Sequence, residues 1–89
     1  MSAFSIELGR QAASYFSRLG KDLQARVGAK LREIAADHEA ESKKLVNRSG
    51  ARSARVGNLR ILFDVNESLR RIEVTAILPR GDVYKRTGN

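Results

Sequence analysis

The side chains best able to do chemistry in this sequence are a run of cations in its second half. Residues 42–60 contain no Asp or Glu and hold six basic side chains: Lys43, Lys44, Arg48, Arg52, Arg55 and Arg60. Such a concentration of positive charge attracts polyanions and steers their approach. It points to nucleic acid, an anionic membrane surface or an acidic protein segment as the partner. The alternative is a solvated basic face that binds nothing specific.

Most other catalytic chemistries lack the residues that they need. The chain has no Cys, which excludes cysteine nucleophiles, thiolate zinc sites and disulfides. Its one His, His38, lies near the expected end of a helix among acidic side chains, and we expect it to be solvated there. Glu39 and Glu41 would face different directions on a helix, so we expect no metal site. The sequence has no glycine-rich phosphate loop, and we expect no cofactor.

Cations alone can support the cleavage of RNA. In that reaction the 2′-hydroxyl of the substrate attacks the neighbouring phosphate, so the substrate supplies the nucleophile and the protein supplies charge. The guanidinium of Arg pairs with two phosphate oxygens and stays charged at any working pH. Positive groups fixed around the phosphate stabilise the transition state selectively. This scheme does not require a His.

Length and composition indicate a single domain over residues 1–89. With 42% hydrophobic and 30% charged residues, the chain is typical of a small globular domain, whose marginal core favours a stabilising partner. The net charge of +7 is uneven, because residues 1–41 are balanced and residues 42–89 carry eleven basic and four acidic side chains. We expect no signal peptide and no membrane span, and the absence of Cys favours the cytoplasm.

The elements in the first half follow from hydrophobic periodicity. Residues 4–8 alternate as a strand does, and two helices follow, one from Arg10 and one over about residues 22–40. Gly20 is expected to end the first helix in a left-handed conformation. The short connection at Gly20 predicts an antiparallel helical hairpin.

Three strands are expected in the second half, over residues 51–56, 59–66 and 69–78. Gly57 and Asn58 predict a type II′ turn between the first two, and Pro79 stops the third. The order of elements predicts an α+β domain with the helical hairpin on one face of a mainly antiparallel three-strand meander. Arg55 and Arg60 would then point toward the uncovered face.

Short motifs in the second half occur in a characteristic order. They are KKLVNRSGARSARVGNLRILFDV over residues 43–65 and IEVTAILPRGDVYKR over residues 72–86. Together these stretches, about 40 residues, resemble the RelE/ParE superfamily of bacterial and archaeal toxins of type II toxin-antitoxin systems. The order of expected elements also agrees with that family. The resemblance implies the microbial RNase-like RelE/ParE fold.

The resemblance also implies a catalytic site. Arg60 matches the strand arginine that holds the phosphate, and Arg55 matches a basic position that stabilises charge or takes up a proton. Arg80 matches the C-terminal arginine that supports the leaving oxygen or the phosphate. Tyr84 matches the aromatic residue that stacks on the nucleotide. RNA or ribosome binding is expected of six further residues: Lys43, Lys44, Arg48, Arg52, Lys85 and Arg86.

Three positions depart from the family's pattern. Ser53 stands where many RNA-cutting members have a second basic residue, and Pro79 stands where a His or Arg often precedes the last motif. Leu59 replaces an aromatic residue. Ser53 and Pro79 weaken the case for efficient proton transfer, although Arg52 or Lys44 could supply the missing cation.

The function implied is that of a type II toxin, a ribosome-dependent mRNA endoribonuclease that inhibits translation. The expected partners are a cognate antitoxin, the ribosome and mRNA, with operator DNA contacted only through the toxin-antitoxin complex and no membrane involved. One alternative is a ParE-like inhibitor of DNA gyrase, against which Arg60, Arg80 and Tyr84 argue. Another is a catalytically degenerate member, which Ser53 and Pro79 favour.

Overall fold

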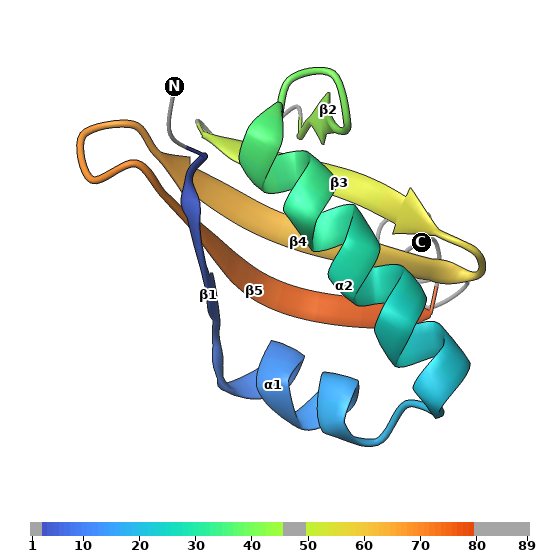
Figure 1. Ribbon diagram of the computed structural model, residues 1–89. Helices are drawn as coiled ribbons and strands as arrows, with labels where there is room; N and C mark the ends of the chain where they lie inside the picture. The colour runs from blue at the N-terminus through green and yellow to red at the C-terminus, as the bar shows by residue number, and fades with distance from the viewer. Residues whose placement is uncertain (1–2, 46–49, 80–89) are drawn as a thin grey trace, which may run out of the picture.

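The computed structural model describes residues 3–45 and 50–79. Within these ranges the elements are, in chain order, β1 (Ser5–Leu8), α1 (Arg10–Ser17), α2 (Lys21–Ala36), β2 (Lys43–Lys44), β3 (Ala51–Val56), β4 (Leu59–Asn66) and β5 (Arg71–Pro79). The strands form one sheet in the order β1-β5-β4-β3-β2. β1 runs parallel to β5, and all other neighbours are antiparallel (Figure 1). The α+β fold and its antiparallel meander are confirmed.

The hairpin between β3 and β4 forms at the predicted turn. Gly57 has φ +55°, whereas Asn58 is not in the left-handed region, which fits a type II′ turn. The third strand begins at Arg71, two residues later than predicted, because Arg70 adopts φ 49° in the preceding turn. It ends at Pro79, whose missing N–H cannot extend the ladder.

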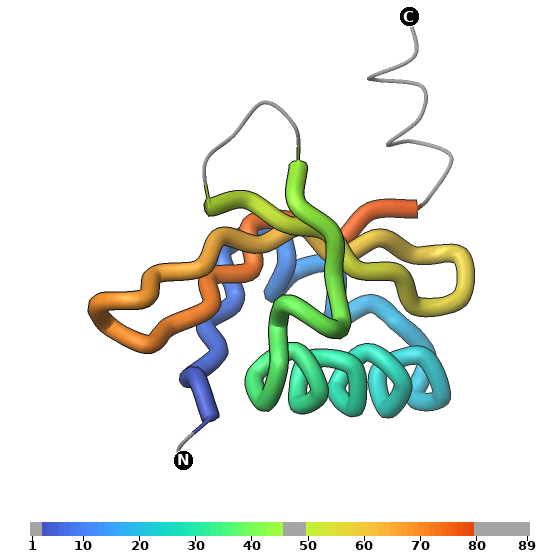
Figure 2. Tube along the Cα trace, turned by 90° about the horizontal axis from the view of Figure 1, so that it is seen from above, coloured from blue at the N-terminus to red at the C-terminus, as the bar shows by residue number. Residues whose placement is uncertain are grey.

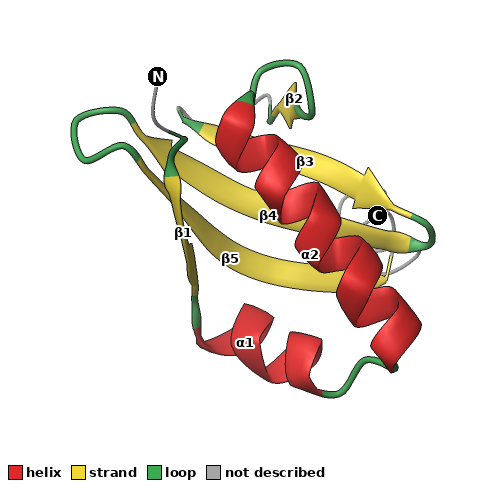
Figure 3. Ribbon diagram, in the orientation of Figure 1, coloured by secondary structure: helices red, strands yellow, loops and turns green. Residues whose placement is uncertain are grey.

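The prediction that Gly20 caps the first helix in a left-handed conformation is wrong. Its φ is −64°, and it is the N-cap of α2, where its carbonyl accepts the N–H of Gln24 at 2.9 Å. α1 instead ends in tight turns, in which Arg18 and Leu19 donate to carbonyls three residues back. The two helices diverge from this link. α1 packs mainly against β5, while α2 lies across the sheet (Figure 3).

The second helix ends at Ala36, four residues earlier than predicted. Asp37 leaves the helical conformation, and its Oδ1 accepts the N–H of Ala40 at 3.2 Å, so a local turn replaces the next helical turn. His38 is consequently not a solvated helix-end residue. Its side chain is 12% exposed, its ring lies edge-on to Phe4 at 5.2 Å, and its Nε2 lies 3.4 Å from Oε2 of Glu67.

The core lies between α2 and one face of the sheet. Figure 2 shows α2 on one side of the strands, and among the described residues no helix covers the opposite face. Apolar side chains from β3, β4 and β5 meet the apolar stripe of α2, and together they form the core: Val27, Leu31, Ile34, Ala54, Val56, Leu59, Ile61, Phe63, Ile72, Val74 and Ile77. Burial of each large side chain contributes about 1.5–3 kcal/mol. This packing fixes which strand residues face the open side.

β2 is an element that the sequence did not predict. It has two residues, too few to show a periodic pattern, and pairs Lys43 with Ser53 and Lys44 with Arg52 on β3. The part of β3 nearer Val56 therefore has no strand on its outer side among the described residues. None of the described helices has the length and apolar character needed to cross a membrane.

Candidate functional site

Arg55 and Arg60 lie directly opposite each other on β3 and β4. Their chain neighbours Ala54, Val56 and Ile61 are buried in the core, so alternation directs both arginines to the uncovered face. Arg55 is exposed and Arg60 is half-buried. Like charges in opposite cross-strand positions are destabilising. The pair therefore fits a role in binding an anion better than a role in stability.

A groove of about 300 Å³ lies at the β3 edge, where β2 ends. We call it the arginine groove. It is lined by Lys30, Ala40, Glu41, Ser42, Lys43, Ser53, Ala54, Arg55 and Arg60. The structure thus brings three of the predicted cations, Lys43, Arg55 and Arg60, to one hollow. The arginines and Lys43 of this hollow suit the binding of a phosphate group.

Lys30 and Glu41 belong to this groove but were missed from the sequence. The Nζ of Lys30 donates to Oε1 of Glu41 at 2.9 Å and lies 3.6 Å from Oε1 of Glu33. The hydrogen bond to Glu41 raises the pKa of Lys30 above its ordinary value, so the ammonium stays charged throughout the neutral range. No local pattern joins residues eleven positions apart, and only the tertiary fold brings them together.

Arg52 was expected to bind RNA or to supply the missing cation, but the structure buries this residue, of which 8% is exposed. Its Nε donates to Oγ of Ser42 at 2.6 Å, and its Nη2 donates to the carbonyls of Ser42 at 3.0 Å and Glu39 at 3.4 Å. The guanidinium thus ties β3 to the segment between α2 and β2. Arg52 has the same strand parity as the buried Ala54, which is a signal that the sequence carried.

The other predicted residues fall into two groups. Lys43 and Lys44 are both exposed on β2, but only Lys43 lines the arginine groove. Five predicted residues lie outside the described ranges: Arg48, Arg80, Tyr84, Lys85 and Arg86. On β5, Leu78 is the ladder partner of Arg60. In the sequence, Arg80 follows Leu78 by two positions.

Two of the residues that depart from the family pattern, Ser53 and Leu59, are buried. Ser53 lines the groove and is 6% exposed, so a neutral hydroxyl stands where a second cation was expected. Leu59 is buried in the core opposite Val56. It therefore does not offer an exposed surface for base stacking.

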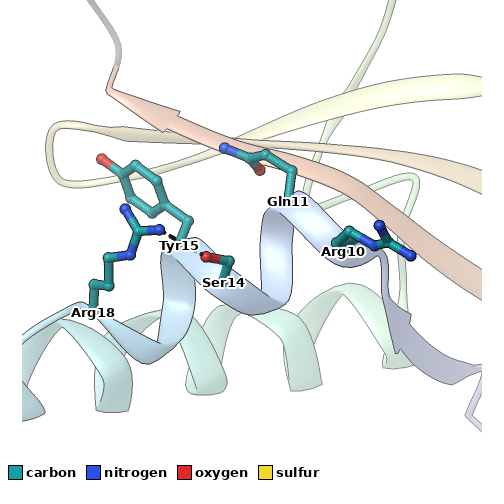
Figure 4. Close-up of a pocket in the computed structure, with 5 residues that line it drawn as sticks. All are labelled: Arg10, Gln11, Ser14, Tyr15 and Arg18. Atoms are coloured by element: carbon teal, nitrogen blue, oxygen red, sulfur yellow. Dashed lines mark hydrogen bonds between the residues drawn. The ribbon is translucent and has the colours of Figure 1, made fainter.

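A separate hollow lies over α1, at the far side of the sheet from β3 (Figure 4). It is lined by Arg10, Gln11, Ser14, Tyr15 and Arg18, none of which is among the predicted site residues. Gln11 and Arg18, which line this hollow, form hydrogen bonds within the fold. The amide of Gln11 bonds the backbone of Ile77, and Nη2 of Arg18 donates to Oγ of Ser14 at 3.1 Å.

No protein-family model matches the sequence, and no curated protein sequence gives a significant match. Solved structures do match. The RelBE2 toxin-antitoxin complex of Mycobacterium tuberculosis matches with a TM-score of 0.77 and 18% identity, over 88% of this chain and 99% of that chain. The RelE-RelB complex of Pyrococcus horikoshii gives 0.74 and 20%, over 89% and 97%. The isolated RelE toxin of E. coli gives 0.75 and 18%, over 97% and 96%. This chain has the fold of the RelE toxins.

Proposed function

We propose that this chain is a RelE-like toxin of a type II toxin-antitoxin system, an endoribonuclease that cuts mRNA on the translating ribosome. The observation that carries the proposal is the placement of Arg55 opposite Arg60 on the uncovered face, with Lys43 in the same groove. Like charges in opposite cross-strand positions repel each other, and an anion bound by both arginines would offset that repulsion. A phosphodiester is such an anion, and the resemblance in motif order makes RNA the polymer.

The proposed reaction needs no nucleophile from the protein. The 2′-oxygen of the substrate forms a bond to phosphorus while the bond from phosphorus to the 5′-oxygen breaks. The 2′-hydroxyl proton goes to a base and a proton reaches the leaving 5′-oxygen, which leaves a 2′,3′-cyclic phosphate and a 5′-hydroxyl. Arg60 holds the phosphate oxygens, and Arg55 stabilises the charge that develops on them. The resemblance assigns the leaving group to Arg80 and nucleotide stacking to Tyr84.

The proposed partners are the ribosome, mRNA and a protein antitoxin, all met in the cytoplasm. Lys43 and Lys44 are exposed and would contact ribosomal phosphates. Two of the similar structures are toxins in complex with RelB antitoxins. By analogy, an antitoxin would cover the arginine groove with acidic side chains, and operator DNA would be bound only by the resulting complex.

The proposal is tested in a translation extract with a reporter mRNA whose 5′ ends are mapped. The wild-type chain should create new ends inside the reading frame, and Arg60→Ala should abolish them. Arg32→Ala is the matched control, because Arg32 is an exposed arginine of α2 that does not line the groove. Intact transcripts with the wild-type chain, or undiminished cleavage with Arg60→Ala, would overturn the proposal.

A second candidate is a catalytically degenerate member that retains the fold and its partner but does not cut RNA. Ser53 favours it, because the groove has a hydroxyl where a second cation was expected. In that case the wild-type chain leaves transcripts intact, and Ser53→Lys should gain cleavage. Gyrase inhibition is tested in parallel by a supercoiling assay, in which we expect no effect.

A further inference from the structure

A second hollow adjoins the arginine groove along the open edge of β3. Its volume is about 310 Å³, and it is lined by Arg26, Ala29, Lys30, Glu33, Arg55, Val56 and Gly57. It shares Lys30 and Arg55 with the arginine groove. The two hollows are therefore neighbours on one basic track between α2 and the β3–β4 hairpin.

Arg26 holds a defined place in this second hollow. A Cβ added at Gly57 would lie 3.3 Å from its Nη2 and 3.6 Å from its Cζ, so the guanidinium lies over the β3–β4 turn. Gly57 satisfies the turn at φ +55° and leaves room for that guanidinium. Arg26 and Lys30 are one turn apart on α2, an axial offset of about 6 Å. This offset is close to one nucleotide step of an extended single strand.

The charges of the track favour an anionic chain. Five cations line the two hollows: Arg26, Lys30, Lys43, Arg55 and Arg60. The two carboxylates that also line them, Glu33 and Glu41, both contact Lys30. Among the described residues, Arg26 and Arg55 form no ion pair. Their guanidinium donors thus remain available to a phosphate.

We infer that Arg26, with Arg55 and the open turn at Gly57, forms a second phosphate subsite that holds the phosphate next to the scissile one on single-stranded RNA. The inference rests on the proposed function, because it takes the arginine groove as the place of the scissile phosphate. Arg55 lies between the two hollows and contacts both phosphates. Arg26 is then a binding residue that keeps the strand in register with the reacting group.

The test uses 2′-O-methyl diuridylate and triuridylate, which carry one and two phosphates and cannot be cleaved because the nucleophile is blocked. Binding is followed by NMR titration of the full chain at low salt. Arg26→Ala should weaken the trinucleotide about tenfold, the loss of one charge-assisted contact. It should leave the dinucleotide unchanged, and it should lower the salt slope for the trinucleotide by about 0.7. Arg32→Ala, the matched control on α2, should change neither.

The outcomes separate this inference from the proposed function. Suppose that Arg60→Ala weakens the binding of both probes, but Arg26→Ala binds them as well as Arg32→Ala does. The second subsite is then wrong, and the arginine groove remains the phosphate site. If Arg60→Ala also binds both probes as well as Arg32→Ala does, the groove does not bind phosphate, and the proposed function is wrong as well. Equal weakening of both probes by Arg26→Ala contradicts the assignment of Arg26 to the second phosphate.

Discussion

At the scale of single residues, the arginine pair is placed at a cost in folding free energy. Arg55 and Arg60 occupy opposite positions of an antiparallel ladder, where like charges repel. An anion bound by both arginines would offset this repulsion. Arg52 shows the opposite case, since it is buried and donates to Ser42 and Glu39. Burial and hydrogen-bond partners thus distinguish Arg52 from the exposed Arg55 on the same strand.

Replacement of Arg55 should separate stability from activity. In Arg55→Thr, the free energy of unfolding should stay within about 0.5 kcal/mol of wild type or rise, because repulsion is removed and Thr suits a strand. Transcript cleavage should fall about 100-fold, because charge stabilisation at the phosphate is lost. Urea unfolding and 5′-end mapping measure the two effects. A loss of stability above about 1 kcal/mol would assign Arg55 a structural role instead.

The sequence could predict part of the site. Strand alternation predicted that Arg55 and Arg60 face the uncovered side, while the family resemblance made them site candidates. The same alternation could have excluded Arg52, which shares parity with Ala54. Lys30 and Glu41 could not be found in this way. They meet only because the segment after α2 folds back against that helix, a tertiary contact with no local signature.

At the scale of elements, the β3–β4 hairpin was predicted to the residue, because the alternating burial of β4 and the Gly57-Asn58 turn agree. The end of α2 was not predicted correctly, because the helix stops at Ala36. Residues 35–41 contain neither Gly nor Pro, so helix propensity alone continues the helix. The Asp37 turn and the packing of His38 on Phe4 end it instead. The hydrogen bond of the Asp37 side chain and the contact of His38 with the Phe4 ring thus outweigh the helix propensity of this segment.

Gln11 of α1 protects the outer edge of β5 beyond the end of β1. Its Nε2 donates to the carbonyl of Ile77 at 3.0 Å, and its Oε1 accepts the N–H of Ile77 at 2.9 Å. Gln11→Ala should lower the free energy of unfolding by about 1–2 kcal/mol, because two partly buried backbone groups lose their partner. Urea denaturation measures it. Ser14→Ala, one turn along α1, is the control and should change stability by less than about 0.5 kcal/mol.

At the scale of the whole molecule, the uncovered face has opposite charge at its two ends. The arginine groove lies at the end nearer the β3–β4 turn, while Asp64, Glu73 and Glu7 are neighbours in the ladder toward the other end. The guanidinium of Arg71 lies 3.8 Å from the carboxylate of Glu7 and 3.6 Å from that of Glu73. The positive charge of Arg71 is therefore paired with these neighbours. We therefore expect a polyanion to be directed to the groove end of the face.

Binding of RNA at the groove should stabilise this small domain. At ten times the Kd, a non-cleavable 2′-O-methyl RNA should add about 1.4 kcal/mol, which is about 7 °C in Tm for a chain of this length. Thermal unfolding with and without the RNA measures the shift. Arg55→Ala/Arg60→Ala should lose most of it, and Arg32→Ala should retain it. An equal shift in the double variant would place the RNA elsewhere on the molecule.

If the arginine groove cleaves RNA through the 2′-hydroxyl, as we propose, the chemistry of the cut ends will show it. RNA fragments from a translation extract treated with the wild-type chain are labelled by a polynucleotide kinase without prior phosphatase treatment. We expect 5′-hydroxyl ends, which label at once, and we expect them to be lost with Arg60→Ala but not with Arg32→Ala. Fragments with 5′-phosphate ends, or 5′-hydroxyl ends that persist in Arg60→Ala, would contradict it.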